Sequence, residues 1–119
     1  MRQLKVYVKK TCKTCQKFIK AAEEAGYTVE TVEFVDRNAL DETKLRDLLK
    51  RAGVRPADVL RKRDRHYKEL GLDKKLPSDD ELIRLMVKYP GLINRPIVVA
   101  GKGVWFRPKP DQVLEEGHS

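Results

Sequence analysis

The chain has 119 residues, of which 40% are hydrophobic and 37% are charged. That length suits a single domain over residues 1–119 with one hydrophobic core. No apolar run approaches the roughly 18–20 residues of a membrane span, and the N-terminal residues lack a signal-peptide core, so we expect no membrane segment. The formal net charge of +8 leaves a nucleic-acid partner open, but 18 acidic residues are interleaved with the basic ones. We therefore favour solvated faces and an anion-binding pocket.

The first third of the chain predicts a strand, a helix and a second strand. Leu4–Val8 has a strand pattern, Thr14–Ala25 has the apolar stripe of a helix that Gly26 ends, and Thr28–Val35 alternates as a strand,. These segments form a right-handed βαβ unit. Residues 36–38 form a turn.

The middle of the chain predicts a helical insertion over about residues 41–91. Asp41 caps a helix that Gly53 ends, and from Val54 to Gly91 we expect only helices,. Ser78 and Glu81 form a capping box.

The last third predicts a hairpin. Its strands are Ile97–Ala100 and Val104–Arg107, and Asp111–Glu116 forms a short final helix,. The elements together predict an α/β fold with a mixed sheet of about four strands.

Both cysteines of the chain, Cys12 and Cys15, lie where the first predicted strand gives way to the first predicted helix. A Cys-x-x-Cys at such a junction is typical of a thiol redox site. Backbone N–H groups at the helix start point at Cys12, and Lys9, Lys10 and Lys13 crowd the same end. We therefore expect a lowered pKa and a nucleophilic thiolate at Cys12. Helical periodicity places Cys15 on the buried face.

Two further roles for the cysteines stay open. They would be inert if they only filled the core, which fits Cys15 better than Cys12. A Cys-x-x-Cys pair can also form half of a zinc site. Structural zinc needs about four ligands, and the rest of the chain offers only His66 and His118 as good nitrogen donors,. We therefore predict no metal. A close pair in an otherwise cysteine-free chain is typical of a reducing compartment, and we expect a cytoplasmic protein.

Five motifs occur in a fixed order over about residues 4 to 115. They are Cys12 at the head of the first helix, Leu60-Arg61-Lys62, Tyr67–Leu72, Leu92–Val99 and Phe106-Arg107-Pro108. With these motifs the sequence resembles the glutaredoxin-coupled, ArsC-type arsenate reductase family and its Spx-like relatives. The resemblance implies a thioredoxin-like fold with a helical insertion.

In that family a cysteine attacks arsenate and three arginines hold the oxyanion. The resemblance places the nucleophile at Cys12 and the arginines at Arg61, Arg95 and Arg107. It places Pro96 at a proline that is cis beside the active cysteine. It implies no bound cofactor; the reductant would be glutathione with glutaredoxin, or thioredoxin. Cys15 would then close a disulfide with Cys12.

Two positions depart from the family pattern, because Val8 and Gln16 stand where the reductases carry a histidine and an arginine. Three hypotheses follow. The first is an arsenate reductase that reduces arsenate to arsenite, which Arg95 and Arg107 favour. The second is an Spx-like redox-sensing regulator that binds RNA polymerase, and the third is a general disulfide oxidoreductase. Cys15, Val8 and Gln16 favour the second or the third over the first. A monomer is our default expectation.

Overall fold

The computed structural model describes residues 3–35 and 40–114 and contains a mixed sheet of four strands. The strands are β1 (Gln3–Val8), β2 (Thr28–Glu33), β3 (Ile97–Ala100) and β4 (Gly103–Phe106). Their order is β2-β1-β3-β4, with β1 parallel to β2 and antiparallel to β3, and β3 antiparallel to β4. This is the predicted α/β sheet, and each strand begins and ends within two residues of its predicted bounds.

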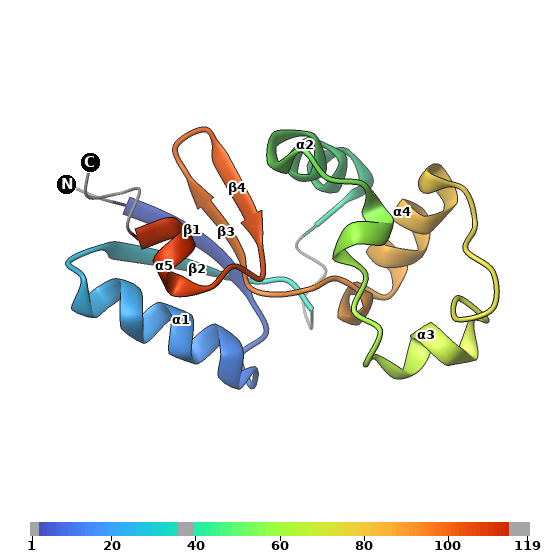
Figure 1. Ribbon diagram of the computed structural model, residues 1–119, viewed down its shortest axis with the longest axis horizontal. Coiled ribbons are helices and arrows are strands. Elements are labelled where there is room, and N and C mark those ends of the chain that lie inside the picture. The colour runs from blue at the N-terminus through green and yellow to red at the C-terminus, as the bar shows by residue number, and fades with distance from the viewer. Residues whose placement is uncertain (1–2, 36–39, 115–119) are drawn as a thin grey trace.

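The helices lie on both sides of this sheet (Figure 1). They are α1 (Lys13–Glu24), α2 (Glu42–Ala52), α3 (Arg65–Glu69), α4 (Asp79–Lys88) and α5 (Pro110–Leu114), with short 3-10 helices η1 (Pro56–Val59) and η2 (Pro90–Leu92). The helix α1 links the parallel strands, as a right-handed crossover requires. Among the described residues, no helix combines the length and apolar character needed to cross a membrane.

Alternation along β1 divides the hydrophobic core between the two faces of the sheet. Val6 and Val8 pack with Phe18 and Cys15 of α1 on one face. Tyr7 points to the other face, where the helical insertion covers the sheet. The predicted insertion thus lies opposite α1, and its apolar residues join those of the sheet in one core cluster.

Two helices of the insertion have the predicted capping residues. The Asp41 side chain accepts from the backbone N–H of Lys44 at 2.7 Å, and Gly53 ends α2 with a φ of 71°. The Ser78 hydroxyl accepts from the N–H of Glu81 at 3.3 Å, which is one half of the predicted capping box. The predicted turn over residues 36–38 and the end of the final helix at 115–116 lie outside the described residues.

The expectation that residues 54–91 would be entirely helical is wrong. Leu60 forms an antiparallel β-bridge with Ile93, flanked by a bond from the N–H of Arg61 to the carbonyl of Leu92 at 2.6 Å. The N–H of Asn94 donates to the carbonyl of Val59 at 2.8 Å. Because the N–H of Arg61 and the carbonyl of Val59 bond across to another segment, they are not free to bond along a continuous helix,. This crossing ties the basic stretch after η1 to the segment that leads into β3.

Candidate active site

The loop between β1 and α1 presents Cys12 at the start of the helix. Cys12 has an extended backbone with φ −80° and ψ 116°, and α1 begins at the next residue. Its N–H donates to the carbonyl of Lys9 at 2.9 Å. Cys12 is partly exposed, whereas Cys15, one turn on, is only 1% exposed and lies in the core. Periodicity therefore predicted the different environments of the two sulfurs correctly.

The surroundings of Cys12 favour its thiolate. Partial burial is the largest influence and raises the pKa of Cys12, but the backbone N–H of Cys15, the Cys15 side chain and the Arg95 guanidinium together hold that pKa below its ordinary value,. Burial, followed by the neighbouring Cys12, raises the pKa of the Cys15 thiol to about 12. The two thiols therefore differ in the direction expected for an attacking and a resolving cysteine, and Cys15 keeps its proton at neutral pH.

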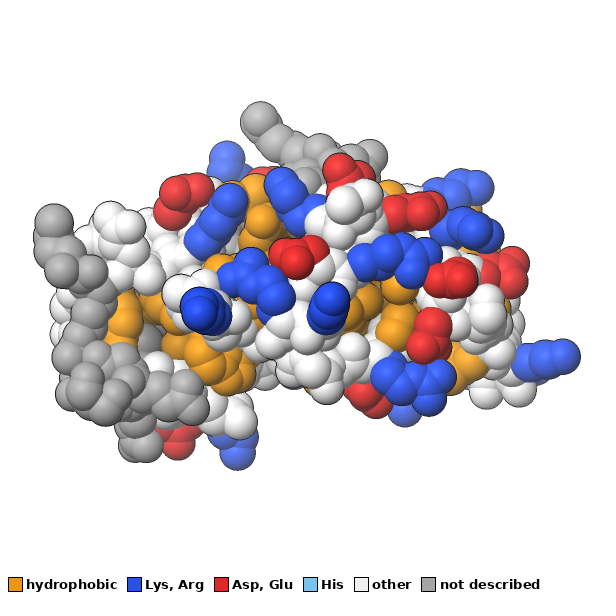
Figure 2. Space-filling model, turned by 90° about the horizontal axis from the view of Figure 1, so that it is seen from above, with side chains coloured by type: hydrophobic (Ala, Val, Ile, Leu, Met, Phe, Trp, Pro, Cys, Tyr) orange, Lys and Arg blue, Asp and Glu red, His pale blue; other side chains and the backbone are white. Residues whose placement is uncertain are grey.

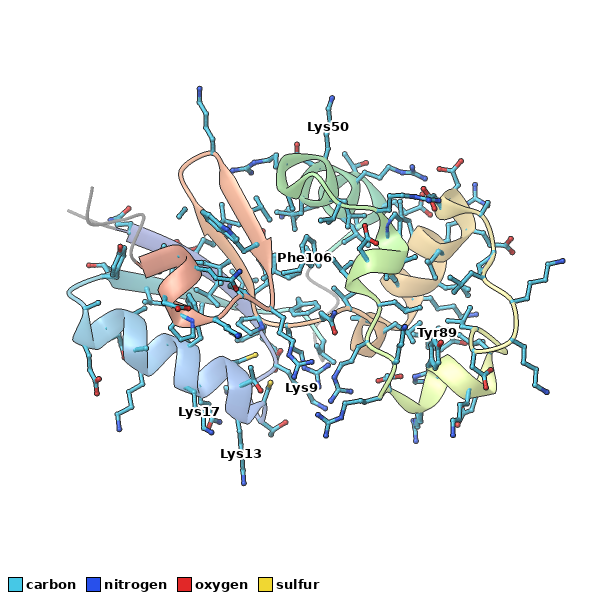
Figure 3. All side chains as sticks on the ribbon, viewed as in Figure 1. Lys9, Lys13, Lys17, Lys50, Tyr89 and Phe106 are labelled. Atoms are coloured by element: carbon cyan, nitrogen blue, oxygen red, sulfur yellow. The ribbon has the colours of Figure 1, made fainter. Side chains whose placement is uncertain are left out.

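The lysines that we expected to assist Cys12 are not among the groups that lower its pKa. Lys13 and Lys17 point away from the molecule along α1, whereas Lys9 lies on the side of the two sulfur atoms (Figure 3). A lysine one residue after the helix cap lies on the outer side of the first turn, so proximity in sequence does not bring its charge to the sulfur. The nearby cation comes instead from Arg95, 83 residues further along the chain.

A small pocket of about 40 Å³ opens at Cys12. It brings together all three predicted arginines with the cysteine; its lining residues are Cys12, Thr14, Arg61, Arg63, Asn94, Arg95 and Arg107. A pocket of this size suits a small ion rather than a peptide. Its charged side chains are the guanidinium groups of the arginines, which form a donor set for a compact oxyanion,.

Arg95 is the buried member of this arginine set. Its side chain and backbone together are 8% exposed, and the Arg95–Pro96 peptide bond is cis, as the resemblance implied. One terminal nitrogen of Arg95 donates to the carbonyl of Gly91 at 3.5 Å, and its buried Nε has no hydrogen-bond partner within residues 3–35 and 40–114. A buried guanidinium with an unused donor costs stability unless a ligand completes its bonds.

Arg61 and Arg107 approach from two other segments. The backbone bond from Arg61 to Leu92 brings the basic stretch beside the segment that carries Arg95. The N–H of Arg107 donates to the carbonyl of Pro96 at 2.7 Å, and Arg107 has a φ of 50°, which is uncommon for a residue with a side chain,. Burial, followed by the charge of Arg95, lowers the pKa of Arg61. The arginines therefore repel one another while they remain protonated.

Three lining residues, Thr14, Arg63 and Asn94, were not predicted as site residues. Thr14 lies inside the Cys-x-x-Cys motif and Asn94 precedes Arg95, so adjacency to predicted site residues was the available signal. Arg63 is an exposed residue that follows Arg61 by two positions in a basic run, and no local signal in that run marks it as a pocket residue.

Beyond this pocket, a larger cavity of about 630 Å³ shares Arg61, Arg63 and Arg95 with it. Lys9, Arg65 and Lys88 add positive charge to its lining. Its one carboxylate among the described lining residues belongs to Asp64, which contacts His66 Nδ1 at 2.9 Å, and the His66 ring stacks on Tyr89 with centroids 4.4 Å apart. His66, which we considered as a zinc ligand, is thus engaged away from the cysteines. Among residues 3–35 and 40–114, no three His, Cys, Asp or Glu side chains gather as a metal centre would need.

Comparison with known proteins places the chain in a family. The model of the ArsC family matches residues 7–115. The chain belongs to the ArsC family. It is 40% identical to the uncharacterised protein YfgD of Escherichia coli, with 96% of each chain covered.

Other ArsC relatives carry a named activity. The chain is 34% identical to an arsenate reductase of Neisseria meningitidis, covering 91% of this chain and 93% of the relative. In structure it is similar to an arsenate reductase from Vibrio cholerae, with a TM-score of 0.85, 27% identity, and 96% and 97% of the two chains covered. The thioredoxin-like fold that the resemblance implied is confirmed by these ArsC structures.

Proposed function

We propose that this ArsC protein reduces arsenate to arsenite with Cys12 as nucleophile and Cys15 as the resolving thiol. The observation that carries the proposal is the buried guanidinium of Arg95, which favours the thiolate of Cys12 and whose Nε has no hydrogen-bond partner among the described residues. Cationic donors that converge on a nucleophile suit a substrate that is itself an anion, because they offset the repulsion between the two negative charges.

In the first step, the Cys12 thiolate attacks arsenic and an arsenate oxygen leaves as water after taking up protons from solvent. The product is a covalent Cys12–arsenate adduct. Arg61, Arg95 and Arg107 bind the remaining oxygens, and Arg63 lines the same pocket. Arginine suits this role because its planar, permanently charged group donates paired hydrogen bonds to such oxygens.

In the second step, Cys15 loses its proton and attacks the sulfur of Cys12. The sulfur–arsenic bond breaks, its electron pair stays on arsenic, and arsenite leaves while the two cysteines become a disulfide. A dithiol reductant, thioredoxin or glutaredoxin, then returns both cysteines to thiols by exchange. Since Cys15 is buried, we expect that exchange to begin at Cys12, through the basic cavity beside it.

The proposal is tested by NADPH oxidation with arsenate, coupled to thioredoxin with its reductase or to glutaredoxin with glutathione. We expect arsenate-dependent oxidation with one of the two systems, abolished in Cys12→Ser. A Cys15→Ser variant separates the steps, because it should still form the adduct and fail to turn over with thioredoxin. No arsenate-dependent oxidation with either system contradicts the proposal.

The Spx-like regulator and the general disulfide oxidoreductase make different predictions in the same assay. A regulator would show no turnover and would bind the RNA polymerase α subunit in a manner that depends on the oxidation state of Cys12 and Cys15. A general oxidoreductase would reduce a model disulfide without any arsenate dependence. The arginine cluster at Cys12 favours the reductase over both, since neither alternative needs an oxyanion pocket.

A further inference from the structure

The peptide unit of Lys10 is held on both sides by side chains from other elements. Its N–H donates to Oε1 of Glu33, at the end of β2, at 2.9 Å. Its carbonyl accepts from Nε2 of Gln16, in the first turn of α1, at 2.9 Å. Both polar atoms of one loop residue are therefore fixed by side chains rather than by regular secondary structure.

The adjoining residue, Lys9, contacts both cysteines through its backbone. Its carbonyl accepts from the N–H of Cys12 at 2.9 Å. Its N–H donates to the sulfur of Cys15, where it favours the thiolate against the larger effect of burial. Any movement of the Lys10 backbone would displace Lys9 and change both of these bonds, because the two residues share a peptide bond.

We propose that Glu33 and Gln16 are positioning residues that hold the Lys9–Lys10 backbone against the thiol pair, and so set the rate at which Cys15 closes on Cys12. The proposal rests on the thiol chemistry proposed above for Cys12 and Cys15. It assigns a task to Gln16, whose amide has the N–H donor that the Lys10 carbonyl requires.

The state of Glu33 supports a role beyond stability. Its second carboxylate oxygen, Oε2, is buried and has no hydrogen-bond partner among the described residues. Burying an unpartnered carboxylate oxygen is unfavourable, so such groups in native proteins call for an explanation. The bond from the Lys10 N–H to Oε1 supplies that explanation, because it anchors the loop that carries the nucleophile.

The test uses Ellman's disulfide and requires no arsenate. In the first phase Cys12 attacks the reagent, forms a mixed disulfide and releases one thionitrobenzoate. In the second phase Cys15 loses its proton and attacks Cys12, which forms the protein disulfide and releases a second thionitrobenzoate. A Cys15→Ser protein, which should release only one equivalent, identifies the second phase.

Glu33→Ala and Gln16→Ala should slow the second phase by about three- to tenfold, the factor that corresponds to one net hydrogen bond. Glu33→Gln keeps an acceptor for the Lys10 N–H and should close at nearly the normal rate. Gln16→Glu places oxygen against the Lys10 carbonyl and should be as slow as Gln16→Ala. Glu30→Ala, an exposed change on the same strand, is the control and should be unaffected.

Normal closure in both alanine variants overturns the proposal, as does slow closure in Glu33→Gln, which would assign the effect to charge rather than to the hydrogen bond. The pH profile of the second phase gives an independent readout. In the alanine variants it should move to higher pH, since Cys15 loses a donor that favours its thiolate, and an unmoved profile also contradicts the proposal. Because arsenate takes no part, failure of arsenate reduction and failure of this positioning role remain distinguishable.

Discussion

The arginines of the α2–α4 side and those of the Cys12 pocket are used in opposite ways. On the α2–α4 side they are paired with carboxylates: Arg46 with Asp80 at 2.8 Å, Arg55 with Asp79 at 3.0 Å, Arg51 with Asp47 at 3.6 Å and Arg84 with Glu42 at 3.8 Å. Blue and red side chains accordingly alternate over the helical end of the molecule in Figure 2. At the Cys12 pocket, none of the four lining arginines has a carboxylate within 4 Å among the described residues.

This difference distinguishes surface arginines in ion pairs from pocket arginines that can bind an anionic ligand. Exposed pairs such as Arg46–Asp80 contribute little because water already satisfies both charges. The pocket arginines repel one another, and the buried Nε of Arg95 has no acceptor in the part of the chain that the structure describes. The cluster lowers the stability of the free protein, and a bound oxyanion would raise it again. Such a cluster is expected at a functional site.

The sharpest test of the comparison removes one arginine from each region. Arg95→Ala should lower kcat/KM for arsenate by about 10²–10³-fold, the usual loss when one buried donor to a developing anion is removed. Arg46→Ala, which breaks an exposed pair, should leave kcat/KM unchanged. Both are measured in the NADPH-coupled assay, with circular dichroism to establish that each variant is folded.

The comparison fails if the two variants lose similar activity. It also fails if Arg95→Lys retains full activity, since a lysine keeps the charge but cannot reproduce the planar, paired donors of arginine.

A smaller effect is expected at the rim of the pocket. Arg107 is exposed, so water screens its charge, and Arg107→Ala should cost about tenfold in kcat/KM for arsenate. Disulfide exchange with Ellman's reagent needs no oxyanion pocket and should change much less. Equal losses in both reactions would mean that Arg107 supports the fold of the cysteine loop rather than the substrate.

A third test uses pH, because the unpaired guanidinium acts on the thiolate of Cys12. Alkylation of Cys12 by iodoacetamide should fall as the pH drops through its pKa, which lies below the ordinary value,. Arg95→Ala removes a group that favours the thiolate, so the midpoint should move to higher pH and the rate at pH 7 should fall severalfold. All profiles are measured in a Cys15→Ser background, in which Arg46→Ala should leave the profile unchanged. If the midpoint of the alkylation profile does not move in Arg95→Ala, Arg95 does not influence the pKa of Cys12.

The sequence predicted the elements of this site better than the interactions within it. The alternation of apolar residues predicted the strands, and their helical periodicity predicted α1 and the burial of Cys15. Burial could be predicted because it depends on which face of the element a residue occupies. Motif resemblance predicted Arg61, Arg95 and Arg107 together. The β-bridge at Leu60 was missed, since a pairing between residues 60 and 93 leaves no local signal. Proximity in sequence also led us to expect that neighbouring lysines would favour the Cys12 thiolate, whereas the cation that lowers the Cys12 pKa is Arg95.

The smallest expected effect is on stability, and it has opposite signs in the two regions. Arg46→Ala should lower the free energy of unfolding by about 0.2–1 kcal/mol, the range of exposed ion pairs. Arg61→Met should raise it by up to about 0.5 kcal/mol, because the change removes a charge that Arg95 repels and keeps much of the length of the side chain,. Urea titration in a buffer without phosphate or sulfate measures both.

Sulfate is a tetrahedral dianion like arsenate. Without it, the free energy of unfolding should be higher for Arg61→Met than for the wild type, and added sulfate should reverse that order. An anion that binds only the folded chain stabilises it by about 1.4 kcal/mol when its concentration is tenfold above Kd, which exceeds the relief of repulsion in the variant. If the free energies of unfolding of the wild type and Arg61→Met cross as the sulfate concentration rises, the arginine cluster lowers the stability of the free protein and increases its affinity for an anion. Parallel curves would mean that Arg61 is a solvated charge like Arg46, and that the pocket holds its ligand through Arg95 and Arg107 alone.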